Sequence, residues 1–285
     1  MKTKVISILI SISLGFNISA QHKLVFTSDR NGNSDIFLYD FKSGTSTQIT
    51  NSEANEYSPT IINNSTISIL KEENNTYYRQ SIDLISGKTT ELPQPKECAL
   101  DDKNMRYGPV SGKMLYSCNG NIFLLNDYNE KAVNLTELME GDSYMPSWFP
   151  DESGITFSNN SSGNMDVYVL YFNNNRISNI TNHPAVDERS EVSPDGNKIL
   201  FSSGRDGNNN MEIYIYDLTD QSLKNITNSP DWELIGRWSP DGRSICFSSN
   251  KNGQWDLFLY LIDSGKTMPL ILSSSFDGDP RFLRD

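Results

Sequence analysis

The sequence predicts an all-β protein, a six-bladed β-propeller of four-stranded antiparallel blades, and three observations lead to this prediction. A related segment recurs six times, with anchors at Phe26, Ile69, Tyr116, Phe157, Phe201 and Phe247 and a period of 41 to 47 residues. The strand that follows most anchors is apolar at successive positions, as in 213–216. The last segment, 277–283, resembles the strands that open the inner repeats. Sheets of this period that are covered on both faces are typical of propeller blades.

The first twenty residues have the pattern of a secretory signal peptide. Lys2 and Lys4 precede an apolar stretch over 5–16, and the segment closes on 18–20 before Gln21. The apolar stretch is shorter than the roughly 20 residues that a membrane span needs. The sequence therefore predicts cleavage after Ala20 and a periplasmic or secreted mature chain, residues 21–285.

The chain carries a large negative charge. Its formal charge is −12, and loss of two lysines and no acids with the signal peptide makes it −14. Such a charge disfavours nucleic acid as a partner, and no other apolar stretch suggests a membrane span. The number of cysteines is odd, so the three cannot form a complete disulfide framework. Cys246 is expected to be a small buried hydrophobic residue, and whether Cys98 pairs with Cys118 stays open.

Each repeat is expected to form four short strands. The copies lie at 25–40, 67–84, 115–127, 156–171, 200–217 and 246–261; the second is degenerate. S-P-D-G at 193–196 and 239–242 is expected to close the hairpin between the first and second strands, since Pro, Asp and Gly suit a tight turn. A looser turn leads into the third strand, and the fourth ends in Q-I-T, N-L-T or N-I-T.

The two ends of the chain are expected to close the ring. The first copy lacks an opening strand because residues 21–28 already belong to its second strand. Residues 277–283 resemble the opening strands at 57–61 and 144–148, so they are predicted to complete the blade that the N-terminus begins. An open solenoid of these units would expose apolar end faces. One propeller domain, 21–285, then accounts for the whole mature chain.

These residues resemble a known family. W-S-P-D-G-x-x-I-x-F-S-S, followed by G-x-x-D-I-Y, I-T-N and D-x-x-P, is similar to the TolB-like propeller repeat. The resemblance covers residues 22–285, is weak in the second and third repeats, and implies an exported propeller. TolB itself carries an N-terminal α/β domain, for which we expect no counterpart before Gln21. The resemblance therefore implies the fold more strongly than the role of TolB.

No convergent set of catalytic or metal-binding side chains is visible in the sequence. His22 is expected to be solvated at the new N-terminus, and His183 has no second histidine near it, although metal sites and catalytic bases need such partners. The segment 29–35 is interpreted as a turn and not as a calcium loop, because other repeats keep turn residues there. The sequence predicts no enzyme activity, no metal and no cofactor.

The connection before each opening strand is the predicted binding region. Three residues before the aligned Pro or its replacement stand Glu56, Arg106, Ser143, Asp187, Glu233 and Asp277. Acids and aromatics on the loops of a rigid scaffold suit contact with a protein or a glycan. The predicted binding residues are Glu56, Tyr57, Arg106, Tyr107, Asp142, Tyr144, Asp187, Glu188, Trp232, Glu233 and Asp277. A second interpretation is that the acids bond turns or a neighbouring blade, and that the tyrosines pack at the inner ring.

Alternation along the opening strands predicts the side chains that line the channel. One step beyond the Pro position stand Thr60, Val110, Ser147, Glu191, Arg237 and Arg281. Glu191, Arg237 and Arg281 come from consecutive blades and are expected to form an ion network, which could also bind an anionic ligand.

The favoured function is an exported, monomeric, non-enzymatic scaffold of the cell envelope that binds a protein through the loops around the channel. The alternative is a propeller that binds or processes carbohydrate, for which the aromatic rim is the support. The presence of catalytic residues would distinguish a carbohydrate-processing enzyme from a scaffold. The shortage of histidines counts against an enzyme.

Overall fold

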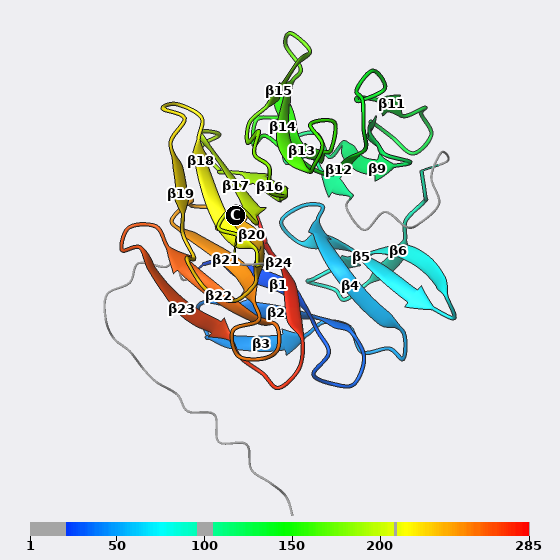
Figure 1. Cartoon of the computed structure of the whole chain (residues 1–285). Coiled ribbons are helices and arrows are strands. Elements are labelled where there is room, and N and C mark those ends of the chain that lie inside the picture. Colours follow the sequence, from blue (N-terminus) through cyan, green and yellow to red (C-terminus); the bar gives the residue numbers. More distant parts are fainter. Residues whose placement is uncertain (1–20, 96–104, 208–209, 285) are drawn as a thin grey trace, which may run out of the picture.

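The protein is a six-bladed β-propeller. The computed structural model describes residues 21–95, 105–207 and 210–284, and in them 24 strands form six four-stranded antiparallel sheets around a common centre (Figure 1). The fold class predicted from the repeats is therefore confirmed. Within the described ranges, no helix has the length and hydrophobicity that a membrane crossing requires.

Each blade is numbered here from the N-terminus, and its strands follow one another from the channel outward. The first three blades contain, in this order, β24 (Asp277–Phe282), β1 (Lys23–Ser28), β2 (Asp35–Asp40) and β3 (Thr45–Gln48); β4 (Asn55–Ile61), β5 (Thr66–Glu73), β6 (Thr76–Asp83) and β7 (Thr89–Glu91); and β8 (Arg106–Tyr107), β9 (Met114–Cys118), β10 (Asn121–Leu125) and β11 (Val133–Asn134). The last three contain β12 (Ser143–Trp148), β13 (Gly154–Asn159), β14 (Asp166–Tyr171) and β15 (Arg176–Asn179); β16 (Asp187–Val192), β17 (Lys198–Ser203), β18 (Glu212–Asp217) and β19 (Leu223–Asn225); and β20 (Glu233–Trp238), β21 (Ser244–Ser249), β22 (Asp256–Leu261) and β23 (Lys266–Ile271).

The C-terminal strand closes the ring as the sequence predicts. β24 lies beside β1 (red and blue in Figure 1) and pairs with it antiparallel, with Leu24 opposite Phe282 and Val25 opposite Arg281. The amide of Leu283 donates to the carbonyl of Lys23 over 2.9 Å. The first blade is thus assembled from both ends of the chain.

Closure also buries His22, which was expected to be solvated. Its side chain is 1% exposed and lies edge-on to the rings of Phe41 and Phe282. His22 Nε2 lies 3.1 Å from Asp241 Oδ2, in the first hairpin turn of the sixth blade. The expectation was wrong because the sequence around residue 22 does not show that the last strand and the last blade cover it.

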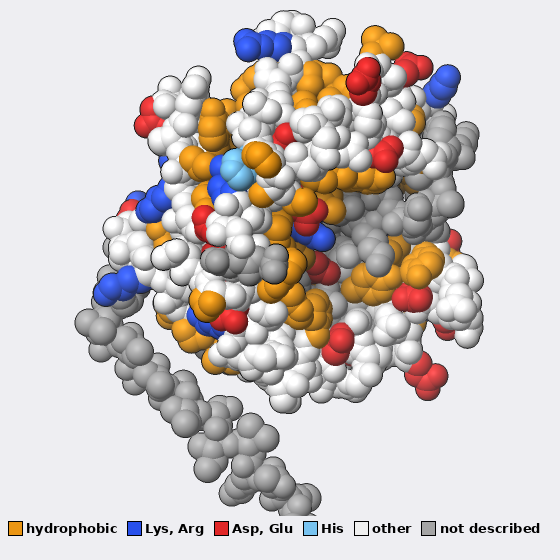
Figure 2. All heavy atoms as spheres, in the orientation of Figure 1, with side chains coloured by type: hydrophobic (Ala, Val, Ile, Leu, Met, Phe, Trp, Pro, Cys, Tyr) orange, Lys and Arg blue, Asp and Glu red, His pale blue; other side chains and the backbone are white. Residues whose placement is uncertain are grey.

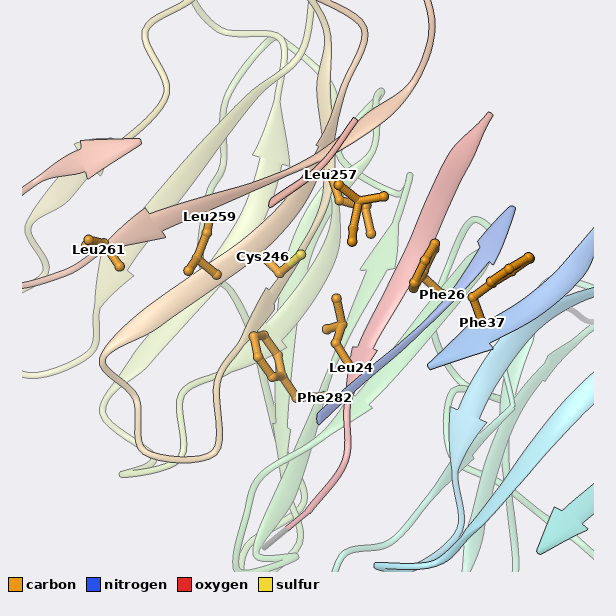
Figure 3. Close-up of a cluster of buried hydrophobic side chains, with 9 residues drawn as sticks. Leu24, Phe26, Phe37, Cys246, Leu257, Leu259, Leu261 and Phe282 are labelled. Carbon is orange, nitrogen blue, oxygen red and sulfur yellow. The ribbon is translucent and has the colours of Figure 1, made fainter. Parts of the chain in front are cut away.

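The core consists of clusters between neighbouring blades. Figure 3 shows the cluster where the sixth blade meets the first, with Leu24 of β1 close to Cys246 of β21 and Phe26 beside Phe37. Strand β22 serves two clusters, because Leu257 faces the first blade whereas Phe258 faces the fifth. This explains why third strands are apolar at successive positions: both faces of the sheet are covered. Cys246 is a free, buried thiol as expected; Cys118 is disulfide-bonded, and Cys98 lies outside the described residues.

A bulge in five of the opening strands lies two residues before the side chain that lines the channel. Ser58, Met145, Arg189, Ile235 and Asp279 all have a positive φ, between 50° and 60°. The register with the second strand shifts at each of them. A bulge inserts one residue and increases the local twist. The bulge therefore lies between the loop-face end of the opening strand and the channel-lining residue two positions later.

The repeated turn motifs have direct structural causes. In S-P-D-G, Asp195 Oδ1 accepts from Ser193 Oγ at 2.5 Å and from the Asn197 amide at 3.1 Å, and Gly196 takes a φ of 76°. In I-T-N, Thr50 Oγ1 accepts from the Ile36 amide over 2.9 Å. These contacts tie the end of one strand to the start of another, which is why the sequence repeats them.

Candidate binding surfaces around the channel

The acids predicted to bind a partner lie at the joints between blades. Glu56, Asp187, Glu233 and Asp277 are each at most 4% exposed, as is Ser143. Their amides donate to carbonyls just before the third strand of the preceding blade, for example Glu233 to Met211 and Asp187 to Met165, each over 2.8 Å. These positions therefore hold successive blades together through the backbone.

Their carboxylates are bonded inside the protein. Asp277 accepts from Arg30 over 2.6 Å, and Asp187 accepts from Arg205 over 2.7 Å. Both arginines also lie over aromatic rings, Arg30 at 4.6 Å from the centre of Phe37. Both of these side-chain contacts lie within one blade. They support the interpretation in which the acids bond local turns, whereas the backbone contacts above join neighbouring blades.

Burial sets the ionisation of two of these acids. It raises the pKa of Glu233 to about 7, although the hydroxyl of Ser249 donates to it over 2.8 Å. Burial also raises the pKa of Asp187, against the opposing effects of Ser203 and Arg205. Both carboxyls bind a proton more readily in the folded chain than in water.

The neighbours of these acids form a more accessible surface. The loops that join successive blades lie on one face of the ring, which we call the loop face. Trp232 is 42% exposed, Asp142 is exposed, and Tyr57, Tyr144 and Glu188 are half-buried. Burial and nearby Glu72 raise the pKa of Tyr57 to about 12. We call Tyr57, Asp142, Tyr144, Glu188 and Trp232 the rim set.

Three residues of the third blade lie elsewhere than the sequence alignment placed them. Arg106 pairs with Leu115, directly before the Tyr116 anchor, so it occupies the channel position assigned to Val110. Tyr107 is 6% exposed in the core, and Val110 is 76% exposed in a turn. The segment 107–112, Y-G-P-V-S-G, has one residue more between its aromatic residue and final Gly than W-S-P-D-G. Pro109 belongs to this turn, so aligning it with an opening-strand proline such as Pro59 shifted the repeat by four residues.

One side chain from each opening strand lines the channel. The channel residues are Thr60, Arg106, Ser147, Glu191, Arg237 and Arg281. Glu191 Oε1 lies 3.4 Å from Arg281 Nη1 and 3.9 Å from Arg237 Nε. Its Oε2 accepts from the Trp238 amide over 2.8 Å.

A cavity of about 430 Å³ opens from these residues toward the face that carries the first hairpin turns, which we call the turn face. Arg106, Arg237 and Arg281 line it together with Trp148 and Trp238, and prolines of four hairpin turns line it as well. On the loop-face side, the same arginines border a space of only about 30 Å³. On the face of the ring that Figure 2 shows, basic, acidic and hydrophobic side chains gather near the centre. We call the larger space the turn-face cavity.

The described residues offer no clear metal centre. No group of three or more His, Cys, Asp or Glu among them is arranged to hold a metal ion. His183 belongs to a loop: its amide donates to Asp166 over 3.0 Å, and its Nδ1 accepts from the Ala185 amide over 3.1 Å. The segment 29–35 likewise forms a turn, with Ser34 Oγ donating to Asp29 Oδ1 over 2.6 Å.

Comparison with solved structures gives the same fold. No model of a protein family matches the chain, and no curated protein sequence matches it. TolB from Acinetobacter baumannii is similar with a TM-score of 0.78 and 18% identity, over 93% of this chain and 67% of that one. An Agrobacterium tumefaciens structure assigned as TolB has a TM-score of 0.70 and 15% identity, over 92% and 97%. An oligogalacturonate lyase in complex with manganese has a TM-score of 0.62 and 15% identity, over 85% and 87%. The TolB-like propeller fold expected from the repeats is confirmed.

Proposed function

We propose that the chain is an exported, non-enzymatic scaffold of the cell envelope that binds a protein partner, as a monomer, through its loop face. The rim set is the observation that carries this proposal. It places two tyrosines, a tryptophan and two acids at the loop-face ends of the opening strands and on the connections just before them, beside the buried joint residues. Partly exposed aromatics on a rigid frame are typical of residues that dominate protein interfaces.

Location follows from the sequence. The signal-peptide pattern ends at Ala20, and residues 1–20 lie outside the described part of the chain. Two TolB structures share the fold, and the repeat resembles that of exported proteins. These observations support a periplasmic or secreted protein that meets its partner outside the cytoplasm.

Carbohydrate binding is the second candidate. Trp232 offers an exposed aromatic face, which suits stacking on a sugar ring as well as contact with a protein. An oligogalacturonate lyase is among the structures of similar fold. Processing of the sugar would in addition require convergent catalytic groups, which the rim set does not provide.

Affinity capture from the native cell envelope tests the proposal. The bait is the chain 21–285 as wild type, as Tyr144→Ala/Trp232→Ala, and as the control Ile85→Ala/Val110→Ala. The control removes two exposed apolar side chains, 85% and 76% exposed, from the turn face. A captured protein should then be purified and titrated against all three baits.

The rim variant should weaken binding by about thirtyfold or more, as expected for loss of hot-spot contacts worth about 2 kcal/mol, and the control should bind like wild type. Retention by the rim variant and loss by the control would move the interface to the turn face and refute the proposal. Absence of any specific protein, together with glycan-array binding that Trp232→Ala abolishes, would establish the carbohydrate alternative.

A further inference from the structure

The turn-face cavity has a charge opposite to that of the whole chain. The described charged residues that line it are four arginines, Arg106, Arg237, Arg281 and Arg284, and one acid, Glu191. The formal charge of its lining is therefore +3, from four cations and one anion, in a chain of −12. Such a concentration of one sign in a concave site attracts ligands of the other sign.

Glu191 cannot balance these cations alone. Its Oε1 is 3.4 Å from Arg281 and 3.9 Å from Arg237, which is longer than a good charge-assisted hydrogen bond. Its Oε2 is taken by the Trp238 amide. Asp279 acts on Arg237 and Arg281 from the narrow loop-face side of the channel, which Arg189 also borders. The carboxylates therefore leave the turn-face side of Arg237 and Arg281 available.

Two buried N–H donors at the cavity lack acceptors. Arg237 is 5% exposed and Trp238 is 7% exposed. Neither Arg237 Nε nor Trp238 Nε1 has a hydrogen-bond partner among the described residues. A buried donor without an acceptor carries a free-energy cost, because it has given up its hydrogen bonds to water. A ligand oxygen at this place would remove that cost.

Desolvation of the arginines also favours the binding of an anion in the cavity. Burial lowers the pKa of Arg281, and the cations of Arg106 and Arg237 lower it further. Burial also lowers the pKa of Arg237. Like charges in a poorly solvated space repel one another strongly, so an anion between them stabilises all of them.

We propose that the turn-face cavity is a binding site for a small ligand that carries an oxyanion, a carboxylate or a phosphate, on an apolar body. The oxyanion lies against Arg106, Arg237 and Arg281, where guanidinium groups can donate in pairs. The apolar body lies against Trp148, Trp238 and the turn prolines. A volume of about 430 Å³ suits such a ligand. The site faces away from the loop face, so it is independent of the proposed protein interface.

Calorimetric titration of the folded chain 21–285 tests this proposal. The probes are phenyl phosphate and benzoate, which separate the two oxyanions, and neutral benzyl alcohol, which keeps the apolar body without charge. The variants are Arg237→Gln, Arg284→Gln, Glu191→Gln and the control Arg243→Gln, whose arginine is exposed in a hairpin turn outside the cavity lining. Thermal melts establish which variants fold.

At least one anion should bind to wild type and to Arg243→Gln, and benzyl alcohol should not. Arg237→Gln should raise the Kd at least tenfold and Glu191→Gln should lower it. Arg284 is half-buried at the edge of the site, so Arg284→Gln still tests the charge if Arg237→Gln fails to fold. The proposal is overturned if neither anion binds, if benzyl alcohol binds as well as the anions, or if the control variant and the cavity variants lose affinity equally.

Discussion

Ring closure by β24 is the feature on which the whole fold depends, and removing residues 277–285 tests it directly. The deletion removes every hydrogen bond between β24 and β1, and it removes Phe282 and Leu283, each 7% exposed. These two belong to different inter-blade clusters, Phe282 between the sixth and first blades (Figure 3) and Leu283 between the first and second. The deletion therefore opens two joints at once.

The magnitude follows from buried side chains. Truncating a buried Leu to Ala costs about 2–5 kcal/mol and a buried Phe about 3–5 kcal/mol. Their sum is comparable to the about 5–15 kcal/mol that stabilises a typical domain. We expect the deletion variant to lose its cooperative transition in urea, followed by circular dichroism and tryptophan fluorescence.

A matched pair of point variants makes the test quantitative. Leu283→Ala and Leu138→Ala remove the same atoms, but Leu138 is 99% exposed. Leu283→Ala should lower the free energy of unfolding by about 2 kcal/mol or more, whereas Leu138→Ala should change it by less than about 0.5 kcal/mol. Equal effects, or an unchanged transition after the deletion, would show that the last strand does not close the ring.

Three further predictions concern the joints and strands. Because the folded pKa of Glu233 is about 7 and the ordinary value is 4.5, the wild type should lose about 3 kcal/mol of stability between pH 4.5 and pH 7 through this group. Glu233→Gln should remove that loss and be more stable than wild type at pH 8; a variant less stable at pH 8 would contradict the burial argument. Arg205→Ala should cost about 3 kcal/mol at pH 7, because it leaves Asp187 buried without its cation, and urea unfolding that shows less than about 1 kcal/mol would assign the pair no structural role. Gly154→Ala should cost about 1–3 kcal/mol by the same assay, because a Cβ there would lie 2.4 Å from the Leu170 carbonyl oxygen; an unchanged midpoint would refute that clash.

The fold could be predicted from the sequence because local turn chemistry and inter-blade packing repeat together. S-P-D-G and I-T-N fix where strands end, and apolar positions on both faces of β18 or β22 require neighbours on both sides. The third blade was misaligned because the S-P-D-G turn sequence is replaced there. β8 has only two residues, Arg106 and Tyr107, so the spacing from acid to Pro that aligns the other blades gives no guide there.

The candidate site could be predicted only in part. An acidic residue at the repeated position looks the same in the sequence whether it is buried at a joint between blades or exposed to a partner. Glu233 and Trp232 are adjacent in sequence, yet one is 1% exposed and the other 42%. Burial at a joint depends on the carbonyl of Met211 in the preceding blade, which no local pattern reveals. The turn-face cavity depends likewise on side chains from all six opening strands, and its fourth arginine, Arg284, follows the last of them.

Comparison of equivalent positions within the chain separates structure from binding. The joint position keeps an acid in Glu56, Asp187, Glu233 and Asp277, and the structure gives these residues similar backbone contacts. The channel position instead varies among Thr60, Arg106, Ser147, Glu191, Arg237 and Arg281. A requirement of the blade itself would apply to every copy. Side chains that differ between copies therefore reflect a requirement that does not repeat from blade to blade. Three arginines at such a position, in an acidic protein, are therefore explained better by an asymmetric anionic ligand than by the needs of the fold.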